Sequence, residues 1–215
     1  MRLAGTGFSL GLGIFLYLLT LRWISEIPGE EVRVLANRMS LLLVWLPLAA
    51  ASQMLRSPLV KYWRKPDWNA QIRVPFIWRG ARRTSVKQFF SIAITANTAA
   101  FLPFTLRGGW QGFLELCVFA LLFAVINAFL EELIWRGTLL GLLSEKIGEG
   151  WASVVTSLGF GLFHLTIGYP IGICLAFAVG GMYFAGVTVK SNSIFPAMLW
   201  HMVLNALMVF SGLIP

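Results

Sequence analysis

The sequence predicts an all-α fold, a polytopic transmembrane helical bundle of about seven to eight spans. Hydrophobic residues make up 58% of the 215-residue chain and charged residues only 12%, and the mean hydropathy is +0.77. These values lie far from the composition of a soluble globular domain. The apolar residues also gather in stretches close to the roughly 20 residues that a helix needs to cross a bilayer.

Seven apolar stretches are candidate spans, three of them within residues 1–109 and four within residues 110–215. In chain order they are 8–24, 39–55, 88–106, 111–142, 151–167, 170–189 and 194–213. The stretch 111–142 is long enough for a bent helix, or for a split into two spans. Arg2 precedes the first stretch and no small-residue cleavage site follows, which favours an uncleaved first span over a signal peptide.

The loop at 55–87 is strongly basic, and Asp67 is its only acidic residue. Its basic residues are Arg56, Lys61, Arg64, Lys65, Arg73, Arg79, Arg82, Arg83 and Lys87. Because an excess of lysine and arginine marks cytoplasmic loops, we expect this loop and the N-terminus to lie inside. Exceptions on the outer side are Arg22, Arg33, Arg38 and Arg107.

Membrane anchoring and orientation explain the net charge of +8, so we expect no nucleic-acid partner. The basic loop also contains Trp63, Trp68 and Trp78, which suits the headgroup region, with substrate recruitment as the alternative role. Cys117 and Cys174 lie inside apolar stretches, where packing is a better interpretation than a disulfide or a metal site.

Two adjacent carboxylates and an arginine interrupt the stretch 111–142. Glu131 and Glu132 point about 100° apart on a helix, so they cannot both address one spot. Arg136 follows Glu132 by four residues, the favourable spacing for an ion pair. We therefore expect Glu132 to be neutralised by Arg136 and Glu131 to face a cavity as a general acid or base. The alternative is a charge-balanced cluster that stabilises a helix end.

Two later stretches contain further polar side chains. His164 lies one turn after Phe160, and His201 and Asn205 share one helix face because they are four residues apart. Asn205 and His201 offer donors for an oxyanion. Simple interhelical hydrogen bonds are the alternative for each position.

Glu131-Glu132-x-x-x-Arg136, Phe160-x-x-x-His164 and His201-x-x-x-Asn205 resemble, in order and interval, the three motifs of the CPBP family. This is the family of CAAX and bacteriocin-processing intramembrane proteases, also described by its ABI domain, with Rce1-like glutamic-type members. The resemblance covers roughly residues 110–212, so 110–215 is expected to be a CPBP-like catalytic core.

The resemblance implies an intramembrane endopeptidase, a hydrolase whose site opens towards the cytoplasm and whose substrate is a membrane-associated protein or peptide. Glu131 would activate a water with help from His164, and His201 and Asn205 would stabilise the oxyanion. Glu132 and Arg136 would be supporting residues. No metal or other cofactor is expected, with a zinc held by Glu131, His164 and His201 as the alternative.

The short chain suggests a bacterial member in the cytoplasmic membrane. Two other functions stay open from the sequence. One is a non-catalytic membrane scaffold or immunity-type protein of the same fold. The other is a small proton-coupled transporter, which the absence of a visible repeat disfavours.

Overall fold

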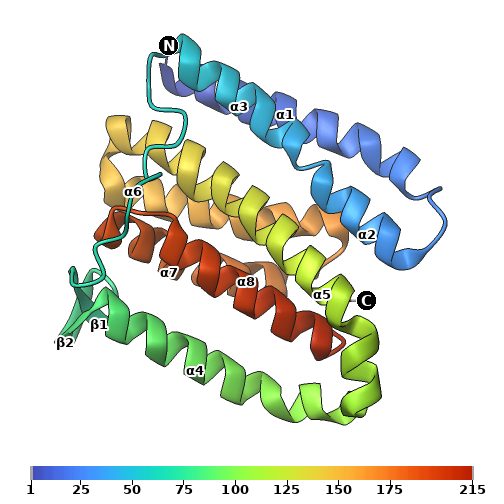
Figure 1. Cartoon of the computed structure of the whole chain (residues 1–215). Coiled ribbons are helices and arrows are strands. Elements are labelled where there is room, and N and C mark those ends of the chain that lie inside the picture. Colours follow the sequence, from blue (N-terminus) through green and yellow to red (C-terminus); the bar gives the residue numbers. More distant parts are fainter. Residues whose placement is uncertain (1, 215) are drawn as a thin grey trace.

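The computed structural model describes residues 2–214, and within them all side chains except those of residues 2 and 108–110. It is a bundle of long helices with one small β-hairpin (Figure 1). The all-α class is therefore confirmed. In chain order the elements are α1 (Arg2–Ile24), α2 (Glu30–Met39), α3 (Leu42–Met54), β1 (Gln71–Phe76), β2 (Arg79–Ser85), α4 (Val86–Thr105), η1 (Leu106–Gly108), α5 (Gly109–Glu132), η2 (Leu133–Leu139), α6 (Leu140–Phe163), η3 (His164–Ile167), α7 (Ile171–Ser191) and α8 (Phe195–Phe210).

Helices are present at each predicted apolar stretch, but fewer of them reach spanning length than expected. Within residues 2–214, four helical segments are long and apolar enough to cross a membrane: Leu3–Ile24, Glu30–Met54, Gln111–Ile167 and Ile171–Ser191. The segment Gln111–Ile167 contains two of the predicted stretches, and α8 is a shorter apolar helix. An integral membrane protein is thereby supported.

The second span begins about nine residues earlier than the sequence predicted. Gly29 adopts φ 86°, a conformation open to glycine, and α2 starts directly after it with Glu30 and Glu31 in its first turn. The sequence did not predict α2, because its charged residues resemble those of a loop. Since Arg38 lies in this helix, it is buried in the bundle and not exposed in an outer loop as expected.

The basic loop contains an antiparallel hairpin, which was not predicted. Strands β1 and β2 pair Ile72 with Thr84 and Arg73 with Arg83. Ile72 and Ile77 are buried against α7 and α8, whereas the arginines point outward. The hairpin then leads into α4, whose first turn is closed by a capping box between Ser85 and Gln88.

Helix α5 continues without a loop through η2, a π-helix, into α6. The chain kinks inside α6 at Gly148, whose φ is 75°. All seven residues of η2 are buried. π-helical turns are rare in proteins, and those that occur are often found at functional sites. The position of η2 therefore indicates where a functional site lies.

Small residues bring the core helices close together, as is usual in membrane bundles. A Cβ on Gly161 of α6 would lie 2.3 Å from the Cys174 carbonyl oxygen of α7. Both cysteines are free; Cys174 is buried, as a packing role predicts, whereas Cys117 is exposed.

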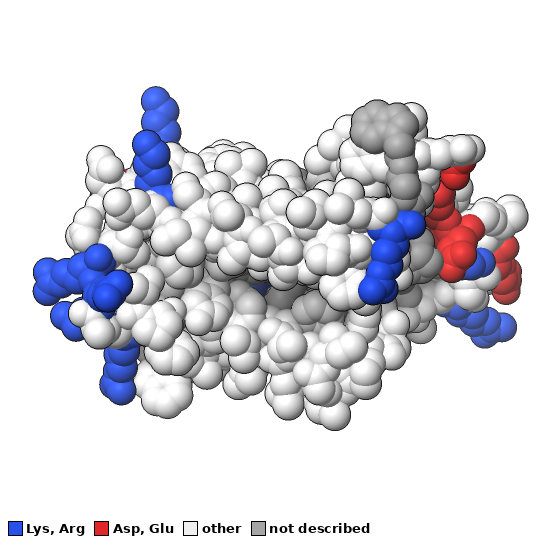
Figure 2. Space-filling model, turned by 90° about the horizontal axis from the view of Figure 1, so that it is seen from below, with Lys and Arg blue, Asp and Glu red and all other residues white. Residues whose placement is uncertain are grey.

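The charged side chains gather at the two ends of the molecule and leave an uncharged belt between them (Figure 2). The N-terminus, the basic loop and the hairpin lie at one end (Figure 1). The α1–α2 turn, with Glu26, Glu30 and Glu31, and the C-terminus lie at the other. Such a belt is the surface that a bilayer would surround.

Candidate functional site

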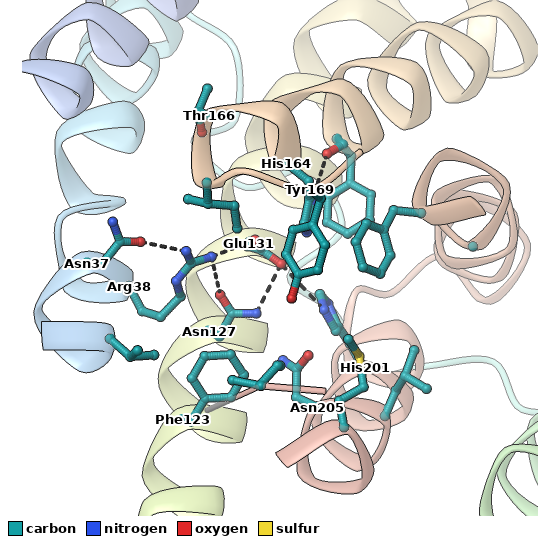
Figure 3. Close-up of a pocket in the computed structure, with 18 of the residues that line it drawn as sticks. Asn37, Arg38, Phe123, Asn127, Glu131, His164, Thr166, Tyr169, His201 and Asn205 are labelled. Atoms are coloured by element: carbon teal, nitrogen blue, oxygen red, sulfur yellow. Dashed lines mark hydrogen bonds and ion pairs between the residues drawn. The ribbon is translucent and has the colours of Figure 1, made fainter. Parts of the chain in front are cut away.

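A cavity of about 590 Å³ lies inside the bundle and brings together the polar residues singled out in the sequence (Figure 3). Its wall includes Glu131, His164, His201 and Asn205, from α5, η3 and α8. All four side chains are buried. Polar residues from three separate elements therefore converge on one cavity.

Glu131 faces the cavity and is fully buried. Its Oε2 accepts a hydrogen bond from Asn127 Nδ2 at 3.2 Å and lies 3.4 Å from His201 Nε2. Its Oε1 lies 3.7 Å from Arg38 Nη1. The carboxylate is thus held in place from three directions, while remaining on the cavity wall.

Glu132 points away from the cavity, as the angular spacing predicted. Its Oε1 accepts a hydrogen bond from Arg136 Nη1 at 2.8 Å, so the predicted pair forms. Arg136 also donates to the Gly181 carbonyl at 3.3 Å, and its guanidinium lies 4.3 Å from the ring centre of Phe160. An arginine with no exposed surface is tolerable because it has an anion, a carbonyl and an aromatic face as partners.

His201 lies between the two carboxylates. Its Nδ1 is 2.9 Å from Glu132 Oε1, and its Nε2 is 3.4 Å from Glu131 Oε2. Hydrogen bonds through both ring nitrogens would require either a doubly protonated ring or a protonated carboxyl group.

His164 has a defined tautomer because its Nδ1 lies 2.8 Å from the Phe160 carbonyl oxygen, which can only accept. When the ring is neutral, Nε2 keeps its lone pair. Tyr169 projects into the cavity beside it (Figure 3). Burial raises the pKa of the Tyr169 phenol, so its hydroxyl stays protonated and can donate.

Asn205 is 4% exposed and lines the cavity. Its Nδ2 has no hydrogen-bond partner among the residues that the structure describes. A buried amide donor without a partner is costly, and a bound ligand with an acceptor atom would satisfy it.

Four further polar residues line the cavity, and the sequence did not predict a role there for any of them: Asn37, Arg38, Asn127 and Tyr169. Arg38 donates to Asn127 at 3.3 Å and contacts Asn37, and so connects α2 to the carboxylate on α5. Asn127 could have been found, since it precedes Glu131 by four residues on the same helix face. Arg38 could not, because only the tertiary fold brings α2 to α5.

The donor atoms of the site decide whether a metal ion would fit. Within the described part of the chain, no three His, Cys, Asp or Glu side chains are grouped so as to hold a metal. Nδ1 of each histidine in the alternative zinc set has a partner, the Phe160 carbonyl for His164 and Glu132 for His201, which leaves Nε2 as the nitrogen that could bind a metal. Because these side chains are not grouped as ligands, they do not form a three-ligand zinc site as arranged.

A second, apolar hollow of about 450 Å³ lies between the hairpin, α4, α7 and α8. It shares Gly180, Phe184 and Leu204 with the main cavity, so the two are neighbours. None of its lining residues is charged.

Fold and site together define the class: an integral membrane protein of helices with a buried carboxylate–imidazole centre on an internal cavity. Residues 114–207, which contain the three motifs, match the family model of Type II CAAX prenyl endopeptidase Rce1-like. The match confirms, for this part of the chain, the predicted resemblance to that family of membrane proteases. No curated protein and no solved structure matches the chain.

Proposed function

We propose that the protein is an intramembrane endopeptidase in which Glu131 activates a water molecule to hydrolyse a peptide bond of a membrane-associated protein or peptide. The family match supports a protease. The observation that carries the detailed proposal is the position of Glu131 on the cavity wall, with its Oε2 3.4 Å from His201 Nε2. His201 shares one face of α8 with Asn205, whose amide nitrogen has no partner among the described residues.

The first step is the attack of water. Glu131 takes a proton from the water, and His164 Nε2 accepts the second O–H and orients the molecule. The water oxygen forms a bond to the carbonyl carbon, and the carbonyl oxygen becomes an oxyanion. Glu131 is suited to this role because its neighbour Glu132 is neutralised by Arg136 and stays out of the cavity.

The second step is the collapse of the tetrahedral intermediate. Asn205 Nδ2 and the Nε2–H of protonated His201 donate to the oxyanion. Once Glu131 has taken a proton, its attraction for His201 Nε2–H weakens, and that donor becomes available to the substrate. The C–N bond then breaks, and the proton on Glu131 passes to the leaving amine.

We also propose that the reaction needs no metal, because the alternative zinc ligands, Glu131, His164 and His201, are not grouped for one. A chelator such as phenanthroline, added to a cleavage assay, tests this directly. Retained cleavage is expected. Loss of cleavage that zinc restores would favour the zinc alternative.

The proposed function is tested with the purified chain in lipid vesicles and a panel of membrane-anchored peptides. Glu131→Gln and His164→Ala should each lower kcat by roughly 10²–10⁴-fold, the usual contribution of a general base. Glu115→Gln, an exposed carboxylate on the same helix, is the matched control and should retain activity.

Cleavage that persists in both variants would end this mechanism. A wild-type chain that binds the anchored peptides but cleaves none of them would favour a non-catalytic scaffold of the same fold.

A further inference from the structure

The hairpin β1–β2 contains four arginines and no acidic residue. They are Arg73, Arg79, Arg82 and Arg83, and all four are exposed. Within the described part of the chain none of them forms an ion pair. Basic side chains gather at the left of Figure 2, the side on which Figure 1 places the hairpin. The hairpin therefore presents a positive surface that no side chain of the described residues neutralises.

Two of these arginines lie directly opposite each other, because the strand register pairs Arg73 of β1 with Arg83 of β2. Directly opposed side chains share one face of the ribbon with their Cβ atoms about 5 Å apart, and like charges placed there repel. Since the neighbouring Ile72 is buried against the bundle, the arginine pair lies on the outer face. An anion between the two guanidinium groups would replace this repulsion with attraction.

Close packing holds the two strands, and with them the arginine pair, at a fixed spacing. A Cβ on Gly80 would overlap the Val74 carbonyl oxygen, so the strands meet closely near the turn. A Cβ on Gly186 of α7 would lie 2.8 Å from Ile77 Cδ1, so the inner face of the hairpin rests directly on that helix. Because the support is already ordered, binding an anion there costs little further ordering of the backbone.

Two features indicate that the anion is the headgroup of a membrane lipid. The hairpin lies at one end of the uncharged belt, at the level where a surrounding bilayer has its phosphates (Figures 1 and 2). Phe76, which ends β1, is 63% exposed, so an aromatic side chain lies beside the arginines. An aromatic ring next to basic side chains suits the boundary between headgroups and acyl chains, whereas a free phosphate ion needs no apolar neighbour.

We propose that the outer face of the hairpin binds the phosphate headgroup of an anionic phospholipid, with Arg73 and Arg83 on either side of the phosphate. Guanidinium groups suit this role because their paired N–H donors match phosphate oxygens. Val74 and Pro75 of the same hairpin line the second hollow, so the bound lipid also stabilises the wall that α4, α7 and α8 share with it. Lipid binding at this site is independent of the proposed hydrolysis.

The test compares thermal unfolding of the full chain in nanodiscs of phosphatidylcholine alone and of phosphatidylcholine mixed with phosphatidylglycerol in equal parts. The variant carries Arg73→Gln and Arg83→Gln. The matched control carries Arg64→Gln and Lys65→Gln, which remove two exposed charges from the same loop outside the hairpin. Glycerol phosphate or an acidic peptide, added to the phosphatidylcholine nanodiscs, distinguishes a soluble anion or a protein partner from a lipid.

Phosphatidylglycerol should raise the melting temperature of the wild type and of the control by about 4 °C, and that of the hairpin variant by less than half as much. In phosphatidylcholine alone, the hairpin variant should melt no lower than the wild type, because the repulsion between the opposed arginines is gone. If the double variant does not purify, Arg83→Gln alone is measured, and the same dependence on phosphatidylglycerol is expected.

An equal response of the hairpin variant and the control would show a diffuse charge effect and would overturn the proposed site. A hairpin variant that melts lower than the wild type in phosphatidylcholine would show that the arginine pair has an internal structural role instead. Stabilisation by glycerol phosphate, or by the acidic peptide, that matches the effect of phosphatidylglycerol would overturn the assignment to a lipid.

Discussion

His201 contacts a carboxylate through each ring nitrogen, which links the proposed base to the buried ion pair behind it. The spacing of Glu132 and Arg136 predicted their pair from the sequence, because a helix brings residues i and i+4 together wherever it lies. The contact of Arg38 with Glu131 depends on the packing of α2 against α5, and no local rule predicts it.

Substitution of Asn205 distinguishes a catalytic role of this residue from a structural one. If its amide stabilises an oxyanion, Asn205→Ala should lower kcat by roughly 10²–10³-fold. The free energy of unfolding should change by less than about 1 kcal/mol, because Nδ2 has no partner to lose among the described residues. Cleavage kinetics and thermal unfolding in detergent measure the two quantities, with Asn97→Ala on α4 as the control. A loss of stability with unchanged kcat would instead identify an interhelical clamp.

At the scale of the elements, α7 positions the arginine through its backbone. The Gly181 carbonyl accepts from Arg136 Nη2, and a Cβ on Gly181 would lie 3.1 Å from both that atom and the Phe160 ring. The Gly181 carbonyl can therefore reach Arg136 because α7 comes close, and a side chain at position 181 would crowd this approach.

The neighbouring glycines of α7 provide a matched pair. Gly181→Ala should cost about 1–3 kcal/mol of unfolding free energy through overpacking, and should lower cleavage because Arg136 shifts. Gly180→Ala should be neutral, or up to about 1 kcal/mol more stable, because a Cβ there meets nothing within 4 Å and alanine favours helix. Thermal unfolding of both variants checks this. Equal melting temperatures for the two would contradict the proposed close contact.

The sequence predicted the apolar helices well and the polar elements poorly. The apolar stretch 111–142 was predicted from its length and composition, with a bent helix and a split into two spans both left open. Helix α2 and the hairpin were not, because their charged residues resembled a loop. In the hairpin, the alternation of buried Ile72 with exposed Arg73 was present but short, and tertiary packing on α7 and α8 makes it stable.

At the scale of the whole molecule, the site crosses the predicted boundary at residues 109 and 110. Arg38 contacts Glu131, Lys61 bonds to Gly137, and the Tyr17 ring lies 5.1 Å from that of Phe163. The family match covers residues 114–207 alone. The N-terminal helices therefore complete a site whose motifs lie in the C-terminal part.

Expression of the chain as two fragments, 1–109 and 110–215, tests this dependence. The fragment 110–215 alone should be inactive and should unfold at a lower temperature, because it lacks Arg38 and the loop that closes the π-helix. Co-expressed fragments should purify together and regain cleavage. A C-terminal fragment that is as stable and as active as the whole chain would show that the N-terminal part is dispensable.

The measurement that tests the central claim most directly is an experimental structure of the Glu131→Gln variant with a trapped peptide substrate. A scissile carbonyl carbon within about 4 Å of the residue-131 side chain is predicted, with its oxygen within hydrogen-bond distance of Asn205 Nδ2. A peptide bound outside this cavity, or a cavity from which His201 and Asn205 point away, would contradict the account.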